Sequence, residues 1–157
     1  MSTDPFFYLP LSGLVIFIIL AIFFFFQKAK IIKKYKQPNA VIIKNISGTT
    51  VTVNKGTLHY NKRSQWGSFD ILINQNSMFL FPRYFYFIPW VFINLTFNSD
   101  RRNTKRPTVL REFHINGNSV ELICYPDFFS TGKRTITLDG LSQEEVLIFQ
   151  KALNKES

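Results

Sequence analysis

The sequence predicts an α+β protein with an N-terminal transmembrane helix, followed by a mainly antiparallel β-sandwich or barrel that a C-terminal helix caps. Three observations support this prediction. An uncharged apolar run occupies Pro5–Phe26, β-branched or alternating segments fill residues 40–138, and a helix-start motif stands at Ser142–Glu145. The 157 residues suffice for one domain of ordinary size and one appended segment.

The first element is the apolar run Pro5–Phe26. At about 1.5 Å per residue in a helix, such a run reaches about 33 Å, which is enough to cross a hydrocarbon layer of about 30 Å. Apolar residues stand at every angle of the helical wheel, whereas a core helix of a small soluble domain keeps a polar face. We therefore expect a transmembrane helix at residues 5–27, preceded by a short translocated head at residues 1–4.

A basic segment follows the apolar run, and we expect residues 28–39 to form a juxtamembrane linker with a hinge at Gln37–Asn39. A cleaved secretory signal, the main alternative, needs a basic N-terminal region, and Met1–Asp4 contains neither Lys nor Arg. Because positive residues beside a span stay inside, we expect the N-terminus outside and the following domain in the cytoplasm. The lysines are candidates for binding lipid phosphates, or act only as a topology signal: Lys28, Lys30, Lys33, Lys34 and Lys36.

The next elements are strands, because residues 40–138 change to β-branched and alternating patterns. Short polar turns at Asn74–Asn76 and Asn116–Asn118 predict two hairpins. The polar stretch Asn61–Gln65 is expected to be a loop that carries Lys62 and Arg63. The expected strands are Ala40–Ile46, Thr49–Val53, Gly56–Tyr60, Phe69–Ile73, Ser77–Phe81, Arg111–Ile115, Ser119–Tyr125 and Lys133–Leu138.

The segment Tyr84–Phe97 allows three interpretations. It is apolar and aromatic, and Arg83 is the only charge in Met78–Phe97. Prolines and the arginine disfavour a second transmembrane span, so a strand is the leading expectation. An interfacial patch that touches lipid is the other alternative, and its candidate residues are Phe85, Phe87, Ile88, Trp90 and Phe92.

The last element is a helix at residues 142–154. Ser142 and Glu145 have the spacing of a capping box, in which each side chain accepts a hydrogen bond from the other residue's backbone amide. Val146, Phe149 and Leu153 then recur on one face, as expected of a helix that packs on a β core.

Charge and composition limit the function classes. The net charge is +9, and the linker lysines supply five of these charges. A second basic cluster is a candidate site for lipid headgroups or an acidic partner, or is a solvated loop: Arg101, Arg102, Lys105 and Arg106. Nucleic acid is disfavoured as a partner, because the aromatic residues precede this cluster as a block and are not interleaved with it.

No motif of a catalytic or cofactor-binding site occurs, so no catalytic residue, metal or cofactor is predicted. His59, His114 and Cys124 are the only residues available for a nucleophile–base pair or a partial metal site, and ordinary packing or surface roles are the simpler interpretation. The single cysteine excludes an intramolecular disulfide.

The order of hairpins followed by one closing helix resembles the pleckstrin-homology-like superfold, including GRAM-like and bacterial PH-like domains. The resemblance covers residues 40–157 and is carried by Gly56–Tyr60, the two hairpins, Lys133–Leu138 and the C-terminal helix. It implies about seven strands with one end of the barrel plugged by Val146, Phe149 and Leu153.

Such domains bind phosphoinositides, peptides or proteins and seldom catalyse a reaction. In lipid-binding members, basic residues around the first strand pair hold phosphate. Here Lys62 and Arg63 stand nearby, but the next strand reads Phe69-Asp-Ile and lacks the second basic pair. The expected function is therefore that of a single-pass, membrane-anchored binding or scaffolding module whose partners are membrane lipids. The alternatives are an accessory subunit that contacts an unidentified membrane protein, and an anchored enzyme.

Overall fold

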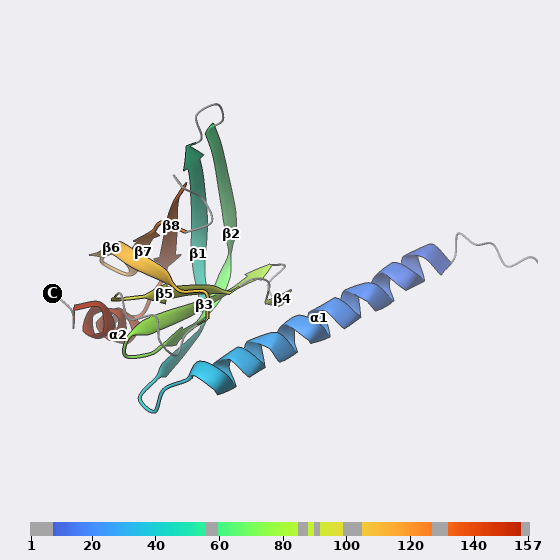
Figure 1. The fold of residues 1–157 in the computed structure, drawn as a ribbon, viewed down its shortest axis with the longest axis horizontal. Coiled ribbons are helices and arrows are strands. Elements are labelled where there is room, and N and C mark those ends of the chain that lie inside the picture. Colours follow the sequence, from blue (N-terminus) through green and yellow to red (C-terminus); the bar gives the residue numbers. More distant parts are fainter. Residues whose placement is uncertain are drawn as a thin grey trace, which may run out of the picture.

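The computed structural model consists of a long N-terminal helix, a β-barrel and a short C-terminal helix (Figure 1). The structure describes residues 8–55, 60–84, 88–89, 92–98, 105–126 and 132–154. Its elements are α1 (Tyr8–Tyr35), β1 (Val41–Lys55), β2 (Tyr60–Ile73), β3 (Ser77–Tyr84), β4 (Ile88–Pro89), β5 (Ile93–Thr96), β6 (Thr108–Asn116), β7 (Ser119–Cys124), β8 (Gly132–Asp139) and α2 (Gln143–Leu153).

Helix α1 has 28 residues, or about 42 Å at the usual rise, and projects well beyond the barrel (Figure 1). Residues Ser12–Tyr35 form the one helix in the described part of the chain that is long and apolar enough to cross a membrane. The helix does not end after the apolar run but continues through Lys28 to Tyr35. The first two thirds of the expected linker are therefore helical, and the chain turns at the expected hinge, where the backbone amide of Ala40 donates to the carbonyl of Gln37 at 3.1 Å.

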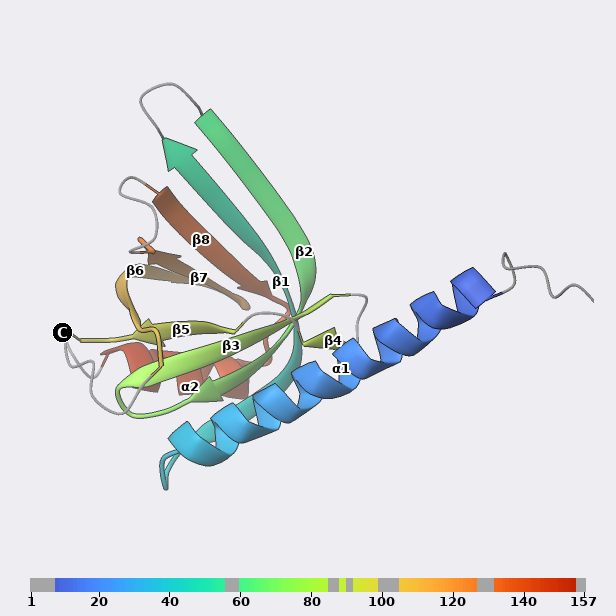
Figure 2. The ribbon, with the colours of Figure 1, turned by 45° about the vertical axis from the view of Figure 1, so that its right-hand side comes forward.

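Seven strands close the barrel in the order β2-β1-β8-β7-β6-β5-β3, because β3 also pairs with β2. Strand β4 pairs with β3 outside this ring and lies against α1 (Figure 2). All pairings are antiparallel except that of β5 with β6. The expected α+β class, with an apolar N-terminal helix and a C-terminal helix around a β-barrel, is confirmed at this level.

Strands β1 and β2 are longer than the sequence indicated. The expected strands Ala40–Ile46 and Thr49–Val53 are one strand, interrupted by an irregularity between Ile43 and Ile46. The expected loop Asn61–Gln65 is wrong: it pairs with β1 as part of β2, so Lys62 and Arg63 lie on a strand. Cross-strand pairing with the β-branched residues of β1 overrides the weak strand preference of these polar residues. Residues 56–59 lie outside the described part.

Both predicted hairpins are confirmed. Strands β2 and β3 pair around Asn74–Asn76, and β6 and β7 pair around Asn116–Asn118, where Gly117 adopts a φ of 58°. In the segment 84–97, the described residues other than Phe92 and Phe97 belong to strands β3, β4 and β5, and none is helical, in agreement with the leading expectation.

The barrel core is filled by inward-facing residues of the seven strands, and α2 packs against it. The capping box is present, with the Glu145 amide donating to Ser142 Oγ at 3.3 Å and the Ser142 amide donating to the Glu145 carboxylate at 2.8 Å. Phe149 and Leu153 are buried in the core, and Val146 packs beside them. The predicted apolar face of this helix is therefore confirmed.

Candidate functional site

The outer face of the β2–β3 hairpin is apolar because α1 covers it. Side chains alternate along a strand, so Ile71 and Leu80 point into the barrel whereas Leu72, Phe79 and Phe81 point outward. These outward residues are buried against Ile31 of α1. This arrangement explains why both strands read as nearly continuous apolar runs: each is covered on both faces.

Helix α1 adds an aromatic contact to the apolar cluster that Ile31 forms with the outer face of the β2–β3 hairpin. Tyr35 stacks on Phe79 with ring centroids 5.5 Å apart and an interplanar angle of 20°, and the Phe92 ring also packs against Phe79, with centroids 6.2 Å apart. Burial of a side chain such as that of Ile31 contributes about 1.5–3 kcal/mol. The last two turns of α1 are therefore docked on the barrel, while its apolar N-terminal part stays exposed.

A buried carboxylate fixes the docked helix electrostatically. Asp70 on β2 is 2% exposed and accepts hydrogen bonds from the Lys28 ammonium of α1 and from the Arg83 guanidinium of β3, the latter at 2.6 and 3.0 Å. Its second oxygen also accepts from the backbone amide of Asn45 at 3.0 Å. Asn45 has a φ of 61° at the β1 irregularity, and this conformation presents its amide to Asp70.

The protonation of Asp70 reflects these partners. Burial alone would raise the pKa of this carboxyl, but the hydrogen bonds from Lys28, Arg83 and the Asn45 amide together hold its pKa below the ordinary value of 3.8. Asp70 is therefore ionised at neutral pH, and it compensates two cations where the helix meets the barrel.

A second polar contact holds the C-terminal end of α1. The Asn74 amide in the β2–β3 turn donates to the carbonyl of Tyr35 at 3.0 Å, and its oxygen accepts from the backbone amide of Gln37 at 3.2 Å. The Gln37 side chain in turn donates to Asn76 at 2.9 Å. The docked segment is thus attached at both ends, at Lys28 and at Gln37.

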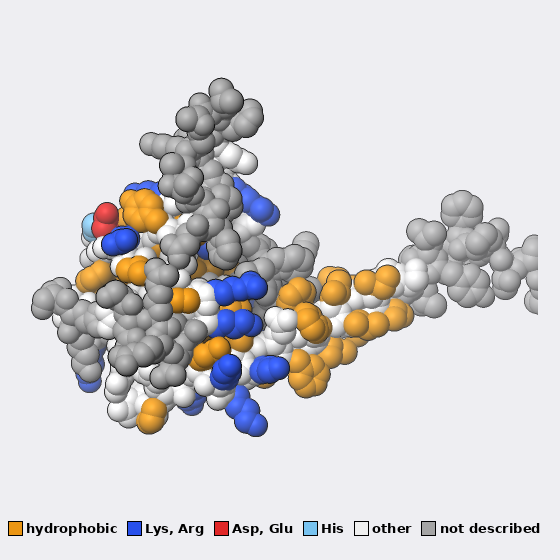
Figure 3. Space-filling view, viewed as in Figure 1, with side chains coloured by type: hydrophobic (Ala, Val, Ile, Leu, Met, Phe, Trp, Pro, Cys, Tyr) orange, Lys and Arg blue, Asp and Glu red, His pale blue; other side chains and the backbone are white. Residues whose placement is uncertain are grey.

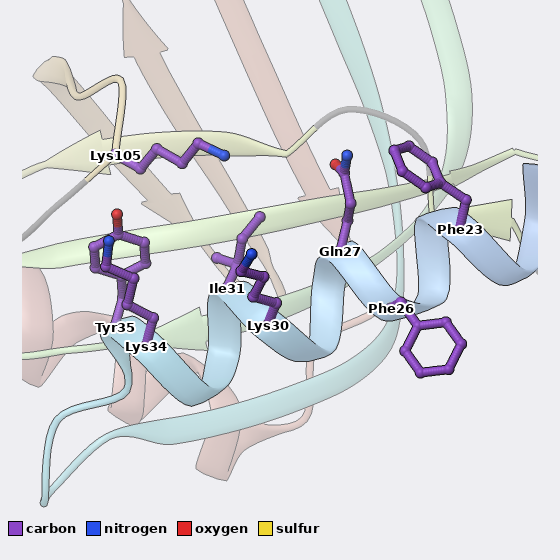
Figure 4. Close-up of a pocket in the computed structure, with 8 residues that line it drawn as sticks. All are labelled: Phe23, Phe26, Gln27, Lys30, Ile31, Lys34, Tyr35 and Lys105. Carbon is purple, nitrogen blue, oxygen red and sulfur yellow. The ribbon is translucent and has the colours of Figure 1, made fainter.

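A groove of about 520 Å³ runs between α1 and the barrel (Figure 4). Lys105, from the segment that precedes β6, extends over it, and every other lining residue comes from α1 (Figure 4). The end nearer the exposed part of the helix is apolar, and the other end carries cations. The lining residues are Phe23, Phe26, Gln27, Lys30, Ile31, Lys34, Tyr35 and Lys105.

The groove is electropositive. Three of its lining residues are lysines and none is acidic. The space-filling view shows Lys and Arg side chains gathered where the apolar helix meets the barrel (Figure 3). Lys105 Nζ lies 5.4 Å from the centroid of the Phe92 ring, and Lys34 Nζ lies 5.2 Å from that of Tyr35, so aromatic faces support two of the three cations.

The structure divides the predicted basic residues into groups. Lys30 and Lys34 line the groove, whereas the exposed Lys33 and Lys36 do not. Lys28 is committed to Asp70. In the second cluster, Lys105 lies in the groove and Arg106 is exposed beside it; Arg101 and Arg102 lie outside the described residues.

Of the candidates for membrane contact, Phe92 is half-buried and packs within the chain against Phe79. The side chains of Phe85, Phe87, Ile88 and Trp90 lie outside the described residues.

Cys124 and His114 are not brought together. Cys124 is fully buried in the barrel core, and this burial raises the pKa of its thiol to about 11, despite the opposing charge of Arg134. His114 is exposed on β6, where it pairs with Glu121 rather than with Cys124. Position 59 lies outside the described residues. Among the described residues, no three His, Cys, Asp or Glu side chains converge as a metal site would require.

Asp70, Arg83 and Asn74 were missed as site residues by sequence reasoning. A signal for two of them existed, because Asp70 interrupts the apolar strand Phe69–Ile73 and Arg83 is the only charge in Met78–Phe97. An isolated charge in a strand buried on both faces needs a partner. The sequence did not show that the two residues would share one, or that a lysine of the helix would join them.

Neither a protein-family model nor a curated protein sequence matches this chain.

Proposed function

We propose that this protein is a single-pass, membrane-anchored binding module that holds a PH-like barrel against the cytoplasmic face of the bilayer. The observation that carries this proposal is the division of α1 into two parts. The large apolar side chains from Leu14 to Phe26 are exposed except that of Phe24, with Phe26 at 72%, whereas the two following turns dock on the barrel. An exposed apolar surface of this extent is typical of a segment solvated by lipid.

The orientation is inferred from the charges beside the span. Lysines occupy the docked end of α1 and the following turn, and the four residues at the N-terminus carry none. Positive residues next to a span are retained in the cytoplasm, so the barrel is placed on the cytoplasmic side.

The PH-like description is supported by arrangement. The barrel has seven strands in its ring, two antiparallel hairpins and a C-terminal helix whose apolar face packs on the core. The parallel pairing of β5 with β6 differs from an all-antiparallel meander, and β4 is an additional short strand. A fold does not specify a function by itself, so the binding role is proposed from the docked helix and the cationic groove that it forms.

The proposal is tested by fractionation and protease protection of the full chain in sealed membranes. We expect the chain to sediment with membranes at high salt and in carbonate, and the barrel to be digested only when protease reaches the cytoplasmic side. A soluble full-length chain would contradict the anchor. Digestion of the barrel from the outside in intact cells would contradict the orientation.

A further inference from the structure

The groove between α1 and the barrel has unequal ends, and this asymmetry indicates what it binds. Phe23 and Phe26 line the end that continues into the exposed apolar helix. Lys30, Lys34 and Lys105 line the other end, and Gln27 lies between the two groups. The volume of about 520 Å³ falls within the roughly 300–1,000 Å³ of typical small-molecule sites.

The three lysines line the same groove although their sources are far apart in the sequence. Lys30 and Lys34 are one helical turn apart on α1, where like charges repel, and Lys105 is brought to them by the segment before β6. None of the three forms an ion pair with an acidic residue of the described part of the chain, in contrast to Lys28, which is neutralised by Asp70. An anion placed among them would remove this repulsion.

We propose that the groove binds one anionic phospholipid, with its phosphate among Lys30, Lys34 and Lys105 and its acyl chains leaving over Phe23 and Phe26 into the bilayer. The inference rests on the proposed membrane anchoring, which places the apolar end of the groove at the lipid boundary. A lysine ammonium attracts the phosphate as a point charge, and the Gln27 amide adds a hydrogen-bond donor. The helix that anchors the chain therefore also forms one wall of its lipid site.

The lining of the groove argues against two simpler descriptions, a general basic surface and a site for free phosphate. A general basic surface would use all the lysines of the segment, but Lys33 and Lys36 do not line the groove. A site for free phosphate would not need an apolar end. The cations of this site lie on the anchoring helix and before β6, away from Lys62 and Arg63 on β2.

The test uses the full chain in nanodiscs of equimolar phosphatidylcholine and phosphatidylglycerol, with native mass spectrometry of the lipid that stays bound. We expect phosphatidylglycerol to be enriched at least about tenfold on the protein, since each lysine near an anionic headgroup contributes about 1 kcal/mol. The triple variant Lys30→Gln, Lys34→Gln, Lys105→Gln should return the bound lipid to the bulk ratio.

The matched control removes the same charge from neighbouring positions outside the groove: Lys33→Gln, Lys36→Gln, Arg106→Gln. This variant should keep the enrichment. Equal loss in both variants would show diffuse attraction and would overturn the proposal, as would a triple variant that binds like the wild type. Displacement of the lipid by inorganic phosphate at equimolar concentration would identify free phosphate as the ligand and would also overturn it.

The outcomes separate this inference from the proposed function. A chain that enters the discs but shows no lipid preference contradicts the groove site and leaves the anchor intact. A chain that fails to enter the discs contradicts the membrane anchor itself.

Discussion

The Lys28 ammonium on helix α1 and the Asp70 carboxylate on strand β2 form an ion pair across 42 positions of sequence. Asp70 is 2% exposed and the Lys28 side chain 16%, so the pair is largely removed from water. Arg83 shares the same carboxylate. This three-residue cluster joins the apolar helix to the barrel, and its disruption has consequences that can be measured.

We expect Asp70→Asn to lower the free energy of unfolding of the barrel by about 1–3 kcal/mol, because it leaves two partly buried cations without a counter-charge. Chemical denaturation of the full chain in neutral detergent measures the change. Hydrogen exchange should also increase in residues 28–35 of α1. The variants Lys28→Gln and Lys30→Gln each remove one positive charge from α1, but only Lys28→Gln removes the ion pair with Asp70. Only Lys28→Gln should therefore raise hydrogen exchange in the docked turns of α1.

The same carboxylate predicts a pH dependence. Its pKa in the folded chain is below the ordinary value of 3.8, so its contribution to stability is complete above the unfolded-state pKa and is lost as the pH falls through the lower folded-state pKa. The wild type should therefore lose stability below about pH 3.9 more steeply than Asp70→Asn does. Denaturation midpoints between pH 6 and 2.5 provide the measurement, and parallel curves for the two proteins would refute this assignment.

The C-terminal helix supplies a test of the barrel core. The Phe149 side chain of α2 is fully buried in the barrel core. We expect Phe149→Ala to destabilise the barrel by about 3–5 kcal/mol, because the substitution removes this burial and leaves a cavity. Leu147 lies on the same helix but is 61% exposed, so Leu147→Ala should change the stability by less than about 0.5 kcal/mol. Similar effects of the two substitutions would show that the helix does not pack as described.

Close contact between β1 and β8 limits residue 48 to glycine. A Cβ on Gly48 would lie 2.4 Å from the backbone carbonyl oxygen of Thr137, so Gly48→Ala must push two paired strands apart. We expect a loss of about 1–3 kcal/mol in the free energy of unfolding of the barrel. Gly13→Ala is the control, because a Cβ at that position on α1 meets nothing within 4 Å.

Cys124 should be unreactive in the folded chain. The thiol is fully buried, so a reagent in solution cannot reach it. Burial also raises its pKa to about 11, so little thiolate forms at pH 8. Reaction with a thiol reagent should be complete in denaturant and absent without it. Rapid reaction of the native protein would contradict this prediction and would support the alternative that the chain is an anchored enzyme that uses Cys124.

Local patterns in the sequence were sufficient for much of the fold. The capping box at Ser142 and Glu145 and the turn at Gly117 depend on residues close in the chain, and both are confirmed. The strand at Asn61–Gln65 was not predicted, because only its pairing with β1 makes these polar residues extended. A similar limit applies to the groove: Lys105 and Lys34 line the same groove only through the closure of the barrel, which no local pattern encodes.

The attachment of α1 at both Lys28 and Gln37 has a mechanical consequence. Helix α1 is continuous from its exposed apolar part into the docked turns, so the barrel follows the tilt of this helix. A membrane-spanning helix accommodates a thinner bilayer by tilting further. A change in the tilt of α1 would rotate the docked barrel by the same angle relative to the membrane surface. If α1 spans a bilayer as proposed, the orientation of the barrel would therefore depend on the thickness of that bilayer.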